Sequence, residues 1–83
     1  MSSPNCRSSG SLTTDGNPFS GAGLLHYAEA TGGTLTCYDG STSGSLLCTV
    51  TSSGAQSFTT PVAYGSSGLH VQISAGSAVV HAS

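Results

Sequence analysis

The three cysteines, Cys6, Cys37 and Cys48, are the residues whose chemistry depends most on what the fold brings together. A hairpin loop centred on Thr42 and Ser43 places Cys37 opposite Cys48. There, Cβ atoms about 4.5–5.5 Å apart allow a disulfide. The odd cysteine count argues against one. The start of the chain has no basic segment followed by an apolar one, which predicts no signal peptide and synthesis in a reducing compartment. We therefore interpret Cys37 and Cys48 as small apolar core residues.

The histidines offer no preformed metal site. His26, His70 and His81 each lack a second His, Cys or carboxylate two or four positions away, the spacings at which strands and helices align ligands. The sequence also contains no C-x-x-C motif, which argues against zinc held by thiolates. We predict no metal and no cofactor, and we expect the histidines to be exposed or to lie at interfaces.

Acid–base and nucleophilic chemistry lack a local motif. Residues 40–44 read G-S-T-S-G, with Thr where a G-x-S-x-G nucleophile would stand, and they fall in a hairpin loop. A carboxylate pair for glycoside hydrolysis would have to come from Asp15, Glu29 and Asp39. Asp15 and Asp39 each precede Gly in a turn, where Asp usually serves the backbone. We predict that the chain is not an enzyme.

The aromatic residues are better explained by packing and contact than by a stacking platform. Five are spread over four segments, and Tyr38 and Tyr64 lie beside Gly-rich loops. Tyrosine combines apolar area with a polar tip, which is typical of interfaces. The candidate interface residues are Tyr38, Asp39, Tyr64, His70 and Gln72.

Charge excludes several classes of partner. The 83 residues include one Lys or Arg, which is Arg7, and three Asp or Glu, for a net charge of −2. One cation cannot neutralise a row of phosphates, so we predict no nucleic-acid binding. A polybasic membrane contact and a long apolar span are also missing from the sequence, so we predict no membrane association.

Apolar residues alternate with polar ones along most of the chain, and no helical periodicity occurs. Short segments with turn signals between them predict an all-β fold, a small antiparallel β-sandwich or barrel. We expect an extended N-terminal arm over residues 1–9 and a single domain over residues 10–83. Residues 15–18 are predicted to be a turn. The predicted strands cover residues 7–13, 24–30, 34–38, 45–51, 57–63, 68–74 and 77–82.

Alternation also predicts which side chains face the core. In residues 24–30 we expect Leu25 and Tyr27 to share one face and Leu24, His26 and Ala28 to share the other. In residues 45–51, Leu46, Cys48 and Val50 are expected on one side. In residues 68–74, Leu69, Val71 and Ile73 face in while His70 and Gln72 face out. Pro61 makes residues 57–63 an edge or bent strand.

The predicted core is thin and the sheet edges are poorly protected. Leu, Val, Ile and Phe total 15 residues, about 18% of the chain. Thr occupies outward positions where Lys and Glu usually blunt sheet edges. A domain of this size that is poor in large apolar residues usually depends on disulfides, a metal or a partner. We therefore expect neighbouring chains to cover these edges.

Three stretches resemble a known family: G-A-G-L-L-H at residues 21–26, G-T-L-T-C-Y-D-G-S-T-S-G-S-L-L at residues 33–47, and G-L-H-V at residues 68–71. Small β-sandwich virion proteins of tailed bacteriophages carry similar stretches, and the resemblance extends over residues 10–75. It implies a capsid decoration (cement) protein on the outer surface of the phage head, made in the host cytoplasm. Members of this family clamp neighbouring major capsid proteins at local three-fold or two-fold positions. Self-association as a dimer or trimer is also expected.

Two alternatives remain open at this point. Some relatives of the family are fibre or tail components, so the resemblance also allows that assignment. A small sandwich could instead bind a glycan or receptor through Tyr38, Tyr64 and the Gly/Ser loops. A pair of converging aromatic rings with Asn, Gln or Asp nearby would favour the glycan-binding module. Flat Thr-rich faces would favour decoration, with the arm over residues 1–9 either adding a strand to a neighbour or lying along the shell.

Overall fold

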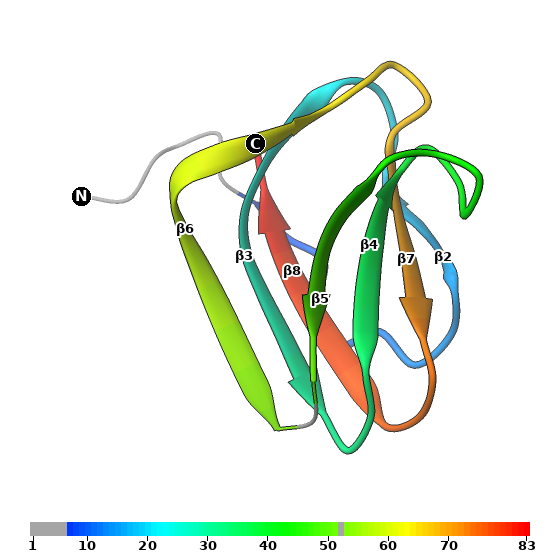
Figure 1. Cartoon of the computed structure of the whole chain (residues 1–83), viewed down its shortest axis with the longest axis vertical. Helices are drawn as coiled ribbons and strands as arrows, with labels where there is room; N and C mark the ends of the chain where they lie inside the picture. The colour runs from blue at the N-terminus through cyan, green and yellow to red at the C-terminus, as the bar shows by residue number, and fades with distance from the viewer. Residues whose placement is uncertain (1–6, 52) are drawn as a thin grey trace.

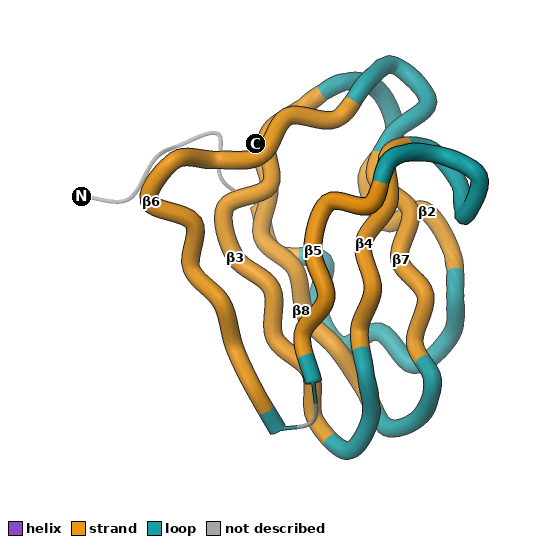
Figure 2. Tube along the Cα trace, in the orientation of Figure 1, coloured by secondary structure: helices purple, strands orange, loops and turns teal. Residues whose placement is uncertain are grey.

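The chain folds into β-strands joined by turns, as a computed structural model that describes residues 7–51 and 53–83 shows. No helix occurs within these ranges (Figures 1 and 2). Accordingly, no helix in the described part could cross a membrane. The strands are β1 (Arg7–Ser8), β2 (Gly16–Phe19), β3 (Gly23–Thr31), β4 (Leu35–Asp39), β5 (Leu46–Val50), β6 (Gly54–Tyr64), β7 (Leu69–Ile73) and β8 (Ser77–Ala82).

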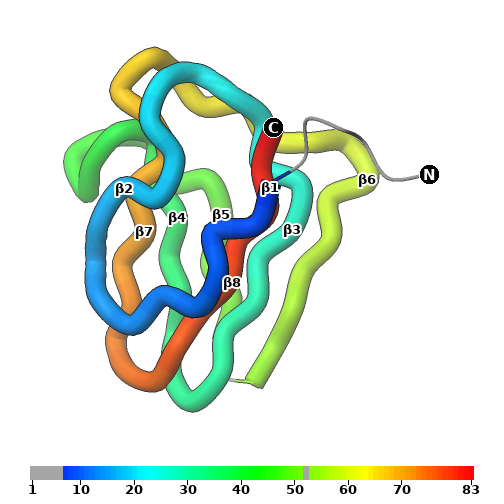
Figure 3. The backbone as a smooth tube through the Cα atoms, turned by 180° about the vertical axis from the view of Figure 1, so that it is seen from behind, coloured from blue at the N-terminus to red at the C-terminus, as the bar shows by residue number. Residues whose placement is uncertain are grey.

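The strands form two four-stranded antiparallel sheets. The first sheet has the order β1-β8-β3-β6 and the second has the order β2-β7-β4-β5. Figure 3 shows the chain passing from β1 to β2 and on to β3, so that it changes sheet twice near its start. The shortest dimension is 19 Å, as expected for two sheets packed face to face about 10 Å apart. The predicted all-β fold is confirmed, and it is a sandwich.

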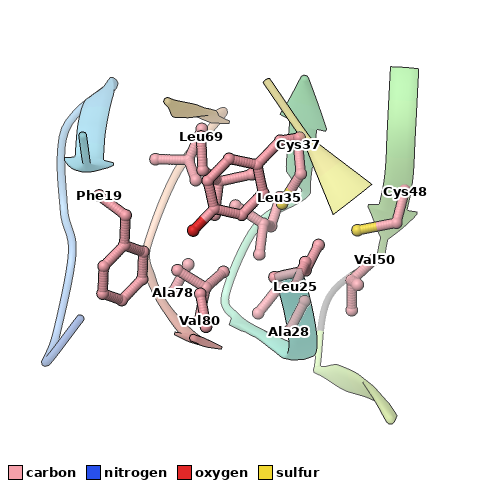
Figure 4. Packing of buried hydrophobic residues seen from close by; sticks show 14 residues of the cluster. Phe19, Leu25, Ala28, Leu35, Cys37, Cys48, Val50, Leu69, Ala78 and Val80 are labelled. Carbon is pink, nitrogen blue, oxygen red and sulfur yellow. The ribbon is translucent and has the colours of Figure 1, made fainter. Parts of the chain in front are cut away.

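The core fills the space between the two sheets, with large side chains set against small ones (Figure 4). The inner face of the first sheet is rich in alanine, including Ala28, Ala78 and Ala82. The second sheet contributes bulkier residues such as Leu35 and Leu69, both fully buried. This pairing lets a chain with few large apolar residues reach close packing. No polar or charged residue is buried within the described ranges.

Most of the predicted strands are present, but the start of the chain differs. The prediction of a turn at residues 15–18 was wrong, because Gly16–Phe19 forms β2 and pairs with β7. Burial of Phe19, which is 5% exposed, outweighs the turn preference of Gly, Asn and Pro here. Pro18 is tolerated because β2 is an edge strand. The predicted strand over residues 7–13 is reduced to β1 and a single bridge between Leu12 and Ala78.

Two bulges change which side chains face the core. In β3, one extra residue lies between Leu25, paired with Ala82, and Tyr27, paired with His81. Leu25 and Ala28 are consequently buried while Tyr27 turns to the outer face, so the expected pairing of Leu25 with Tyr27 on one face was wrong.

The second bulge lies in β5. Cys37 pairs with Cys48, but the next residue, Tyr38, pairs with Leu46, which leaves Leu47 as the extra residue. Cys48 is buried as predicted, while Leu46 is 61% exposed. The expectation that Leu46 shares one side with Cys48 and Val50 was therefore wrong, and the cause is the local shift of register.

The two edge strands of the first sheet, β6 and β1, correspond to the predicted bent strand and to part of the predicted arm. β6 is an edge strand, as Pro61 indicated, and it bends sharply in Figure 1. The bend follows from the register, since Tyr27 pairs with Ser57 and Leu25 with Val62. Of the predicted arm, residues 1–6 lie outside the described residues. Residues 7 and 8 form β1, which pairs with β8.

The Arg7 guanidinium lies 5.1 Å above the centre of the Phe19 ring. Arg7 belongs to the first sheet and Phe19 to the second. This cation–π contact therefore ties the two sheets together where the chain crosses between them.

Candidate functional site

One row of side chains crosses the outer side of the second sheet. Asn17, His70, Tyr38 and Leu46 come from β2, β7, β4 and β5 in that spatial order. Tyr38 is the cross-strand partner of both His70 and Leu46. The Tyr38 and His70 rings lie 6.3 Å apart at 45°. The row therefore joins four strands that are separate in the sequence.

A second row lies beside the first. Thr36 is the cross-strand partner of Gln72 on β7 and of Thr49 on β5. Between the two rows, the intervening residues of the same strands, such as Cys37 and Val71, point into the core. We call the seven outward residues the contact face, and none of them is Asp, Glu, Lys or Arg: Asn17, Thr36, Tyr38, Leu46, Thr49, His70 and Gln72.

Asn17 fixes the orientation of His70. Its amide nitrogen donates to the carbonyl oxygens of Gly40 at 3.1 Å and Ser67 at 3.3 Å. The amide oxygen therefore faces His70 Nδ1, 2.7 Å away, and accepts from it. Nδ1 is therefore the ring nitrogen that donates a proton in this contact.

The five predicted interface residues lie in three different places. Tyr38, His70 and Gln72 lie together on the contact face. Asp39 lies at its end, where a carboxylate oxygen accepts from the Gly65 backbone N–H at 2.9 Å. Tyr64 is 4% exposed and packs in the core, so its assignment as a contact residue is corrected. Burial raises the pKa of the Tyr64 hydroxyl, and the Arg7 guanidinium acts in the opposite direction.

The remaining polar candidates serve the fold. An Asp15 carboxylate oxygen accepts from the Ile73 N–H of β7 at 2.7 Å, so Asp15 serves the backbone as predicted, although that of a distant strand and not of a turn. His26 Nε2 lies 2.8 Å from Ser83 Oγ, and His81 packs edge-on against Tyr27 with ring centres 5.3 Å apart. Within residues 7–51 and 53–83, no group of three His, Cys, Asp or Glu gathers where it could hold a metal.

An open depression of about 300 Å³ adjoins the second row of the contact face. The depression can receive a side chain from a partner, and the polar groups in its lining include both hydrogen-bond donors and acceptors. The residues that line it are Asp15, Thr34, Thr36, Gln72, Ile73 and Ser74.

Four of the seven contact-face residues are not among the candidate interface residues: Asn17, Thr36, Leu46 and Thr49. Asn17 was expected in a turn, and Leu46 was expected on one side with Cys48 and Val50. The position of Leu46 depends on the bulge in β5, which alternation within β5 alone cannot reveal. A signal for Asn17 was available, since Pro18-Phe19 could have been read as the end of an edge strand.

Comparison with protein-family models, curated proteins and solved structures finds no match to this chain. The features of the chain that bear on its function are therefore the contact face and the three sequence stretches.

Proposed function

We propose that this chain is a structural virion protein, a capsid decoration subunit. It binds the outer surface of the phage head through the contact face and stabilises contacts between major capsid proteins. The observation that carries the proposal is Leu46, a large apolar side chain 61% exposed beside Tyr38 on a face without charged residues. Such a face can be buried without removing ionised groups from water.

The resemblance and the contact face coincide in the chain. The longest matched stretch, residues 33–47, spans β4, the hairpin loop and the start of β5. Its two strand ends supply Tyr38 and Leu46. A second stretch, residues 68–71, holds His70. The segments that resemble decoration proteins are thus the segments that build most of the first row.

A decoration subunit stabilises a shell by binding the assembled lattice and not its dissociated subunits. This role needs a firm, flat contact and no catalytic group. The outer row fits it, because Asn17 holds His70 in place and His70 in turn packs beside Tyr38. Side chains that are already ordered lose little further entropy on binding.

The alternative of a glycan-binding module loses its main support. It used both Tyr38 and Tyr64, with the Gly/Ser loops, on one glycan, but Tyr64 is buried in the core while Tyr38 lies on the outer side. The fibre or tail alternative shares the same contact chemistry and differs in copy number.

The test is the copy number of this chain in purified particles, measured by quantitative mass spectrometry against the major capsid protein. We expect hundreds of copies in a simple ratio to the capsid subunit. A few to a few dozen copies would assign the chain to a fibre or tail. Absence from particles would overturn both virion assignments.

A matched pair of variants tests the contact face with the same measurement. Leu46→Asp places a charge in the first row, whereas Leu24→Asp places one at a residue that is 40% exposed on the first sheet. We expect Leu46→Asp to reduce the copies per particle at least tenfold, and Leu24→Asp to leave them close to wild type. Equal occupancy by both variants would exclude the contact face as the binding surface.

A further inference from the structure

Cys37 and Cys48 are direct partners across the hairpin formed by β4 and β5. Both are free thiols, 0% and 8% exposed, and both belong to the core between the sheets. In Figure 4 the Cys48 sulfur points toward the side on which Cys37 lies. The prediction that the two residues lie opposite each other is therefore confirmed.

The backbone between them has a spacing that suits a disulfide. The Thr34 carbonyl, just before β4, accepts from the Ser74 N–H, just after β7. Because backbone groups alternate along a strand, the even-numbered residues of β4 direct theirs toward β7. Cys37, at an odd position, directs its groups toward β5, as does Asp39, whose N–H donates to the Ser45 carbonyl at 2.9 Å. Hydrogen-bonded antiparallel pairs have Cα atoms about 5.5 Å apart, within the range of about 4.4–6.8 Å that disulfides span.

We propose that Cys37 and Cys48 form an intramolecular disulfide when the folded protein meets a low-molecular-weight disulfide oxidant, and that this bond fastens the β4–β5 hairpin. The two thiols fill the core as small apolar residues in the reduced protein. Oxidation joins side chains that already face each other. This inference concerns the hairpin itself and holds whatever surface the protein binds.

Reaction begins at Cys48. This residue lies on β5, an edge strand, so local opening exposes it before Cys37, which lies on the inner strand β4. A hydrogen bond from the Cys37 thiol lowers the pKa of Cys48, while the same contact, together with burial, raises the pKa of Cys37. Cys48 is therefore the thiol that ionises first.

The exchange is balanced with oxidised glutathione as the oxidant. The Cys48 thiolate attacks one sulfur of glutathione disulfide, which forms a mixed disulfide and releases a glutathione thiolate. That thiolate takes the proton of Cys37, and the Cys37 thiolate attacks the Cys48 sulfur and releases the second glutathione thiolate, which takes up the proton that Cys48 lost. One protein disulfide and two glutathione molecules result, and the two electrons pass to glutathione.

The new bond between Cys37 and Cys48 encloses residues 38–47, which contain the turn between β4 and β5. Cross-linking this loop restricts the unfolded chain. For a loop of this length in a domain of this size, we expect the thermal midpoint to rise by about 10 °C.

The test uses the full chain carrying Cys6→Ser, so that two thiols remain. The folded protein is incubated with oxidised glutathione, and we expect the intact mass to fall by two hydrogen atoms, with fragment ions that join residues 37 and 48. The oxidised protein should melt about 10 °C higher than the reduced protein. Mapping the same cross-link in the wild-type chain makes the result independent of how Cys6→Ser folds.

Two single-thiol controls complete the design. Cys6→Ser combined with Cys37→Ser, or with Cys48→Ser, should show no rise in midpoint after the same treatment. The inference is overturned if the two thiols stay free under native conditions, if a mixed disulfide with glutathione persists, or if the internal disulfide forms without raising the midpoint.

Discussion

Asn17 illustrates how single polar residues in this chain organise the backbone around a surface. Its amide reaches two carbonyls, Gly40 in the β4–β5 loop and Ser67 in the β6–β7 turn. Its oxygen holds His70. One exposed side chain on an edge strand therefore fixes two loops and one residue of the contact face. In a chain with only four charged residues, such hydrogen bonds between neutral groups take the place of the ion pairs that are common on the outer surface of a sheet.

Tyr64 makes the free energy of unfolding depend on pH in the alkaline range. Burial raises its pKa above the ordinary value of 10.0 in the folded chain. From pH 10 up to the raised value, the unfolded chain releases the phenolic proton while the folded chain keeps it. The contribution of Tyr64 is thus fully present below pH 10 and is lost as pH rises through the folded pKa. The free energy of unfolding should therefore fall in this window.

Tyr64→Phe tests this dependence. Phenylalanine keeps the ring but has no proton to lose, so we expect a shallower decline in stability above pH 10 than in the wild type. Urea unfolding of both chains from about pH 9 to about pH 11.5 gives the two profiles. Other titrating groups are common to both chains and cancel in the difference. Parallel profiles would show that Tyr64 titrates alike in the folded and unfolded chains.

Two turns lie against each other at one end of the sandwich, where β3 leads into β4 and β7 leads into β8. The turn between β3 and β4 contains Gly32, and the turn between β7 and β8 contains Gly76, with a positive φ of 69°. A Cβ at Gly76 would overlap the Thr31 carbonyl oxygen and lie 2.9 Å from the Gly32 carbonyl carbon. Gly76 therefore meets two demands, a left-handed backbone and a close approach of two turns.

Gly76→Ala and Gly21→Ala separate these two demands. Gly21 has a similar φ of 78°, but a Cβ there meets nothing within 4 Å. We expect Gly21→Ala to cost about 1–2 kcal/mol for the left-handed conformation alone. Gly76→Ala should cost a further 1–3 kcal/mol or so for the overlap. Urea unfolding measures both, and equal losses would mean that the two turns separate freely.

The alternation of apolar and polar residues predicted most of the strands, but it predicted neither of the two bulges. Ser77–Ala82 matches the prediction residue for residue, because Ala78, Val80 and Ala82 face the core without interruption. The bulges in β3 and β5 arise from pairing with neighbouring strands, so no pattern inside either strand announces them. Of the candidate site, outward residues of regular strands were predictable, such as His70 and Gln72. Leu46, placed by a bulge, was not.

For the whole molecule, the sandwich class followed from the sequence but the strand order did not. β8 lies between β1 and β3, and β7 lies between β2 and β4, so strands distant in the sequence are neighbours. Such order depends on how the two sheets pack, which local patterns do not encode. The inner faces explain the outcome in part, since the Ala-rich β3 and β8 are adjacent and lie opposite the bulkier β4 and β7.

The low charge of the molecule predicts how its binding responds to salt. The contact face has no Asp, Glu, Lys or Arg, and the chain has a net charge of −2. Salt weakens association mainly by screening pairs of exposed charges. Under the proposed function, we therefore expect the affinity for shells stripped of this protein to change less than about twofold between about 50 mM and about 500 mM NaCl. Co-sedimentation over a range of protein concentrations measures it.

Sulfate tests the apolar part of the binding, because it strengthens the burial of apolar surface by being excluded from protein surfaces. Replacing chloride by sulfate at equal ionic strength should tighten binding of the wild type. It should have less effect on Leu46→Asp, which lacks the exposed apolar side chain. A steep loss of affinity with added NaCl would mean that charged groups carry the contact. None of the charged side chains of the described residues, at Arg7, Asp15, Glu29 and Asp39, belongs to the contact face, but Asp39 lies at its end and Asp15 lines the adjoining depression. Binding would then have to extend beyond the seven contact-face residues.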